Sequence, residues 1–134
     1  MPKFLLMVNH NNGVFDDVPM DEWKPEEVTA HMNYYDVLGR ELAESGEQIQ
    51  FMALADPRLA RIVRSDGTTT PVVTDGPFPE SKEVLAGFQV VDVESEARAI
   101  EIAARVSAVP GPGGVAIQQP VEVRQVMTEE GGDV

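Results

Sequence analysis

The chain has 134 residues, of which 43% are hydrophobic, and this length and composition fit one globular domain with its own core. It contains no cysteine, which excludes disulfides, thiolate metal sites and thiol nucleophiles. Its 10 basic and 23 acidic residues give a net charge of −13, which argues against nucleic acid and anionic membranes as partners.

The first apolar segment covers residues 3–9 and predicts a β-strand. It is too short for the apolar core of a signal peptide, and no segment approaches the roughly 20 apolar residues of a membrane span. We therefore expect a cytoplasmic protein without a membrane partner. Phe4 and Leu6 point to one face of this strand and Leu5 points to the other, so both faces should be covered.

A loop and a helix follow this strand. Residues 10–25 are rich in Asn, Asp, Gly and Pro, and Trp23 is expected to fix the end of this loop to the body. Pro25 suits a first helical turn, and the spacing of the apolar residues predicts a helix that runs to Ser45. The expected apolar stripe of this helix consists of Val28, Met32, Tyr35, Leu38 and Leu42.

The middle of the chain is predicted to be strands. We expect them at residues 48–55, 59–64, 70–73 and 85–93. The second and third of these form a short hairpin around Ser65–Asp66–Gly67, which is a good turn signal. A loop over residues 75–83 separates the hairpin from the strand that follows.

The last part of the chain predicts one helix and one strand. The helix begins at Ser95 and runs to about Val106, a loop covers residues 110–114, and the strand lies at 121–126. The acidic end, residues 129–134, is expected to fray.

The element order is therefore β-α-β, a hairpin, and β-α-β again. It predicts an α+β fold of the ferredoxin-like type, in which two helices cover one face of an antiparallel sheet. Residues 1–128 would form this single domain.

The strands also predict a homodimer. With both helices on one face of the sheet, the residues of the other face would meet water, yet three strands are apolar on both faces. A two-fold dimer that packs sheet against sheet would cover this face. The alternative is that the hairpin covers part of it.

The loop after the hairpin carries a recognisable motif. Residues 73–83 read VTDGPFPESKE, which resembles the signature DGPFAETKE of the DGPF branch of the YCII-related family, with Pro79 and Ser81 as departures. The strand at 85–93 and the segment 121–127 also resemble that family. The resemblance extends over nearly the whole chain.

This resemblance implies a dimeric α/β barrel built from ferredoxin-like halves. In the wider family a His–Asp pair is suspected of catalysis, and one relative removes HCl from a chloroaromatic breakdown product. Some relatives of the DGPF branch are linked with alternative sigma factors, which implies regulation instead.

The predicted topology brings candidate catalytic residues to one rim of the sheet. His31 lies in the first turns of the helix, and the loop that begins at Asp75 returns to the same edge. His31 would act as a general base near neutral pH, and Asp75 would orient it. Alternatively, His31 pairs with Glu27 or stacks near Tyr35, and the loop is only a rigid turn.

Five further residues are candidates for contacts to a substrate. They are His10, Tyr35, Phe78, Lys82 and Glu83. Each also has a structural interpretation: a loop cap for His10, core packing for the two aromatic residues, and solvated charges for Lys82 and Glu83.

We expect no metal and no cofactor, because the two histidines lie on separate elements and lack the spacing of a ligand pair. Two functions then stand side by side. The first is an enzyme that moves a proton on a small organic molecule by His/Asp acid–base chemistry. The second is a non-catalytic module that binds a small molecule or a regulatory protein partner.

Overall fold

The computed structural model describes residues 1–9, 18, 20–55, 57–76 and 84–127. The long strands are β1 (Lys3–Asn9), β2 (Gln48–Ala53), β5 (Leu85–Asp92) and β6 (Val121–Gln125), and they form one antiparallel sheet in the order β2-β5-β1-β6. The helices are α1 (Pro25–Glu44) and α2 (Glu96–Ser107). The predicted α+β arrangement is confirmed, and the strand order is consistent with the ferredoxin-like plan.

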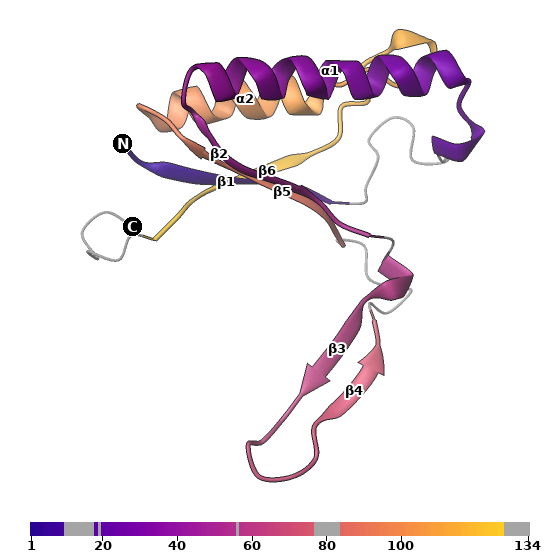
Figure 1. Ribbon diagram of the computed structural model, residues 1–134, viewed down its shortest axis with the longest axis vertical. Helices are drawn as coiled ribbons and strands as arrows, with labels where there is room; N and C mark the ends of the chain where they lie inside the picture. Colours follow the sequence, from indigo (N-terminus) through magenta and orange to yellow (C-terminus); the bar gives the residue numbers. More distant parts are fainter. Residues whose placement is uncertain (10–17, 19, 56, 77–83, 128–134) are drawn as a thin grey trace.

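Both helices lie on the same side of this sheet (Figure 1). Neither helix in the described ranges combines the length and the apolarity that a membrane span requires. The core lies between the helices and the sheet. Its buried apolar side chains come from β1, β5, α1 and α2 and include Phe4, Leu6, Leu38, Leu42, Val91, Ile102 and Val106.

The other face of the sheet carries no helix, and we call it the free face. Strand alternation places Leu5 and Met7 of β1 there, opposite Val90 and Phe88 of β5. Met52 of β2 pairs with Phe88 and is 45% exposed. An apolar band therefore crosses three strands of this face.

Strands β3 (Arg61–Arg64) and β4 (Val72–Asp75) form a separate two-stranded hairpin, which we call the arm. It projects from the end of the sheet, on the side opposite the helices (Figure 1). Every residue from 58 to 75 is exposed, so the arm does not cover the free face, and the alternative that the hairpin covers it is wrong.

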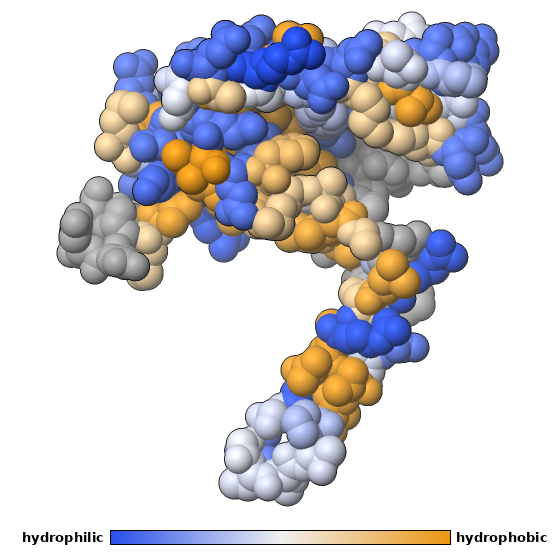
Figure 2. Space-filling model, viewed as in Figure 1, coloured by the Kyte–Doolittle hydropathy of each residue, from blue (hydrophilic) through white to orange (hydrophobic). Residues whose placement is uncertain are grey.

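Apolar side chains gather along the middle of the arm (Figure 2). Val63 and Val73 face each other across the two strands and are 61% and 58% exposed. The turn at the far end is held by the Asp66 carboxylate, which accepts hydrogen bonds from the backbone N–H groups of Thr68 and Thr69 at 2.9 Å.

Candidate functional site

Helix α1 presents His31 to the interior. The buried residues of this helix are His31, Leu38 and Leu42, and Tyr35 is half-buried between them. Met32, predicted to lie in the apolar stripe, is 50% exposed, so that part of the prediction was wrong. Consecutive residues of an α-helix are about 100° apart around its axis, so Met32 points away from the inner face that carries His31.

His31 is only 7% exposed, and its ring lies between two aromatic rings. Its centroid is 5.3 Å from that of Trp23 and 5.1 Å from that of Tyr35, both in edge-on geometry. Trp23 is itself held, because its indole N–H donates to the Val18 carbonyl oxygen at 3.2 Å. The contact with Tyr35 that the sequence suggested as an alternative is confirmed, and the aromatic neighbours fix the ring in place.

A backbone carbonyl sets the protonation of this ring. His31 Nδ1 lies 3.0 Å from the Pro110 oxygen, which can only accept, so Nδ1–H is the donor. In the neutral ring the lone pair is then on Nε2, which has no hydrogen-bond partner among the described residues. Burial lowers the pKa of His31 and the bond to Pro110 partly opposes this, so the neutral form prevails near pH 7.

The loop that supplies this carbonyl is tied to α1 at a second point. The Glu27 carboxylate accepts from the backbone N–H of Gly113 at 2.6 Å and from that of Lys24 at 2.9 Å. These two hydrogen bonds lower the pKa of Glu27. Glu27 therefore does not pair with His31; it fastens the loop that orients His31.

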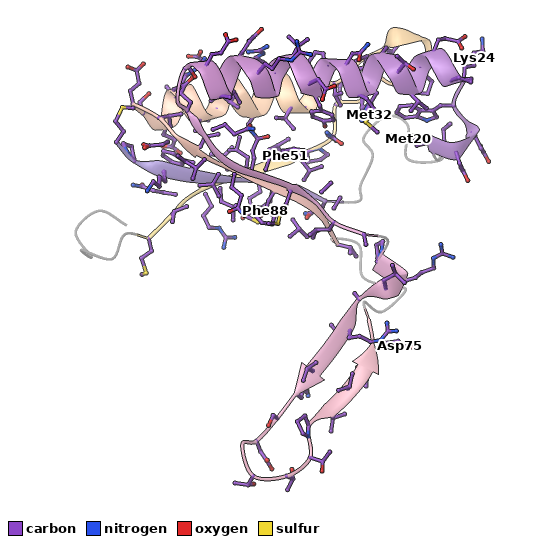
Figure 3. The ribbon with its side chains drawn as sticks, viewed as in Figure 1. Met20, Lys24, Met32, Phe51, Asp75 and Phe88 are labelled. Atoms are coloured by element: carbon purple, nitrogen blue, oxygen red, sulfur yellow. The ribbon has the colours of Figure 1, made fainter. Side chains whose placement is uncertain are left out.

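His31 lines a cavity of about 260 Å³ between α1 and the sheet, which we call the His31 cavity. Its walls are mostly apolar and include Leu6, Val8, Phe51, Ala53 and Val106. Phe51 lies on the helix side of the sheet and Phe88 on the opposite side, and Met20 lies near the start of α1 (Figure 3). Gly87 is required in the wall, because a Cβ there would lie 2.8 Å from the Met52 carbonyl oxygen.

Polar groups converge on this apolar cavity. The Gln119 amide donates to the Tyr35 hydroxyl oxygen at 2.7 Å and to the Val106 carbonyl at 3.3 Å, which leaves the hydrogen of the Tyr35 hydroxyl free to donate. Burial raises the pKa of Tyr35, so this hydroxyl stays protonated. An apolar cavity with a few fixed polar groups is typical of a small-molecule site.

Asp75 is the last residue of β4, on the arm (Figure 3). Its side chain is 89% exposed and lies 3.4 Å from Arg61 Nε. The structure therefore does not bring Asp75 to His31, and the orienting role expected of it is filled by the Pro110 carbonyl.

The other predicted contacts divide into two groups. Tyr35 lines the cavity beside His31. His10, Phe78, Lys82 and Glu83, and the tail 129–134, lie outside the described residues. Within the described part of the chain, no three His, Asp or Glu side chains converge in a way that could hold a metal ion.

Three contributors to the site escaped the sequence analysis: Pro110, Gln119 and Gln89. Every residue has a carbonyl, so no sequence signal marks that of Pro110. Gln119 and Gln89 are both buried. Gln89 lies between Phe88 and Val90, and a glutamine inside an apolar strand was an available signal, whereas Gln119 follows another glutamine and carried no such signal.

Comparison with known proteins supports one assignment. The model of the YCII-related domain matches residues 3–124. The chain is also 31% identical over 88 residues to "Uncharacterized protein R00369" of Rhizobium meliloti (strain 1021), over 66% of this chain and 70% of that protein. The match covers every strand and helix that surrounds the His31 cavity, and the chain therefore belongs to the YCII-related family.

Proposed function

We propose that the protein binds a small carbonyl-bearing or aromatic molecule in the His31 cavity and moves a proton on it, without a cofactor. The observation that carries this proposal is the 3.0 Å contact between His31 Nδ1 and the Pro110 oxygen. It leaves Nε2 as a free base in a site where burial keeps the ring neutral.

The chemistry follows from the two groups at the cavity. Nε2 takes a proton from a carbon next to a carbonyl, and the electron pair of that C–H bond moves onto the carbonyl oxygen. The Tyr35 hydroxyl donates a hydrogen bond to this oxygen as its charge grows. His31 then returns the proton to the same carbon or to another atom of the molecule, so that no co-reactant is consumed.

A direct test uses phenylacetone, a neutral ketone, in D2O. We expect the protein to speed the exchange of its CH2 protons, followed by proton NMR, and His31→Gln to return the rate to that of buffer. A positioned general base contributes about 100-fold or more. Asp75→Asn is the matched control and should exchange at the wild-type rate. Wild-type exchange at the buffer rate would refute the proposal.

The second candidate function is binding without chemistry, as in a regulatory module. One observation favours this function: among the described residues, no Asp or Glu carboxylate contacts His31. In that case phenylacetone would raise the Tm of the wild type, because a ligand that binds the native state stabilises it by mass action. The rise should be smaller for His31→Ala, and neither protein should speed the proton exchange of phenylacetone. The assignment to the DGPF branch, proposed from residues 73–83, is compatible with either function.

We also propose a homodimer in which the free faces of two sheets pack together, as in a dimeric α/β barrel. The apolar band of Leu5, Met52 and Phe88 supports it. The arm descends on this same side, so it would flank the second copy (Figure 1). Sedimentation should give a dimer at micromolar concentration and a folded monomer for Phe88→Lys. A wild-type monomer would contradict the proposal.

A further inference from the structure

A second hollow, the α1–β2 groove, opens between helix α1 and the edge strand β2 and has a volume of about 480 Å³. Its lining includes Tyr35, Phe51 and Gln89, which also line the His31 cavity. The Tyr35 and Phe51 rings lie 6.4 Å apart where the two hollows adjoin. A ligand that fills the cavity can therefore extend along these rings into the groove.

The groove contains an arginine that forms no ion pair within the described part of the chain. Arg40 lines it, is exposed, and forms no ion pair with any described residue. Four other arginines each pair with a carboxylate: Arg61, Arg98, Arg105 and Arg124. Asp36, one turn before Arg40, also lines the groove but is not within ion-pair distance of it. In a chain of net charge −13, Arg40 is thus a local cation available to an anion.

Two amides add hydrogen-bond donors beside this charge. Gln89 is only 5% exposed, and its side chain has no hydrogen-bond partner in the described part of the chain. Among the described residues the buried side-chain polar atom that lacks a partner is Asp92 Oδ1, so the Gln89 amide is open to the solvent of the groove, where a ligand oxygen would accept a hydrogen bond from it. The Gln48 amide nitrogen stands over Gly39, 3.8 Å from where a Cβ of that residue would lie.

Gly39 itself keeps the groove open. A glycine in the middle of a helix costs about 1 kcal/mol relative to alanine, and no positive φ requires it here. Its missing side chain leaves space between α1 and Gln48.

From these contacts we propose that the α1–β2 groove binds the carboxylate of the substrate, with Arg40 as its charged partner and Gln48 and Gln89 as amide donors. The substrate class is then a small aromatic or otherwise apolar carboxylic acid, whose carboxylate lies at the end remote from His31. This rests on the proposed function of the His31 cavity. His31 and Arg40 are nine residues apart on α1, about 13 Å along the helix, and the reach of the arginine side chain shortens the span.

The test compares two probes of the same shape, 3-phenylpropanoate and the neutral 3-phenylpropanamide, by NMR titration of the full chain. We expect the carboxylate to bind more tightly and Arg40→Gln to weaken it about tenfold with little effect on the amide. Asp36→Asn should tighten carboxylate binding about threefold, because it removes a like charge from the groove. Arg64→Gln, the same charge change on the arm, is the matched control and should leave both affinities unchanged.

Three outcomes would overturn the inference, and they differ in whether they also refute the proposed function. If both probes bind equally and Arg40→Gln changes neither, the carboxylate assignment is refuted while the proposed function stands. The same holds if Arg64→Gln weakens carboxylate binding as much as Arg40→Gln does. If neither probe binds and phenylacetone exchange also stays at the buffer rate, both the cavity function and this inference are refuted.

Discussion

The substitution Gly39→Ala should have opposite effects on two properties: it should stabilise helix α1 and weaken ligand binding in the α1–β2 groove. The new methyl group would lie 3.8 Å from the Gln48 amide nitrogen, an ordinary contact, and would meet no other atom within 4 Å beyond its own helix and chain neighbours. The substitution should therefore deliver the helix-propensity gain of about 1 kcal/mol. For a domain of this size, with an unfolding entropy of about 2.1 cal/mol/K per residue, this corresponds to a rise in Tm of about 3–4 °C.

The same methyl group narrows the α1–β2 groove, so 3-phenylpropanoate should bind about fivefold more weakly or worse, since overpacking costs about 1 kcal/mol or more. Calorimetry gives the Tm and titration gives the affinity. Ala30→Gly, at an exposed position of the same helix outside the groove lining, is the control: it should lower the Tm by a similar amount without weakening binding. A fall in Tm for Gly39→Ala would refute the packing argument, and an unchanged affinity would refute the occupation of the groove.

Three further predictions concern the polar groups of the site. Because burial keeps the pKa of folded His31 below its unfolded value of about 6.5, stability should be full above that pH and fall below it, and urea titrations of His31→Gln should lack this loss. Tyr35→Phe leaves Gln119 one acceptor short and should cost about 1 kcal/mol in urea unfolding while slowing phenylacetone exchange. Glu27→Gln should weaken the hydrogen bond to the Gly113 N–H, seen as faster amide hydrogen exchange in the non-proline residues of 111–116, and unchanged exchange there would contradict this role of Glu27.

The sequence predicted the sheet and helices well because their signals are local. Strands with apolar residues on both faces and a proline-started helix appear close to the expected residues, and β1 matches its predicted range of 3–9. The inner face of α1 was predicted less well. The spacing of the apolar residues allows Met32 on the inner face as well as His31, and only the tertiary contacts of His31 with Trp23 and the Pro110 carbonyl decide that His31 points inward.

The site was predictable only in part. His31 and Tyr35 were found because their side chains carry chemistry, and they do lie together. The partner expected for His31 was a carboxylate, whereas the structure supplies the main chain of Pro110, 79 residues away. The hairpin was predicted from its turn. The direction in which the arm projects depends on the backbone at the base of the hairpin, and no pattern within residues 59–73 predicts this direction.

The arm has a consequence for how stability is distributed in the chain. Its two four-residue strands pair only with each other, and an isolated two-stranded hairpin is marginal in water. Its amides should therefore exchange through local opening, while those of β1 and β5 exchange only when the whole domain unfolds. The arm can accordingly be lengthened, trimmed or rewritten in sequence at little cost to the fold, which makes it the part of this chain most free to diverge.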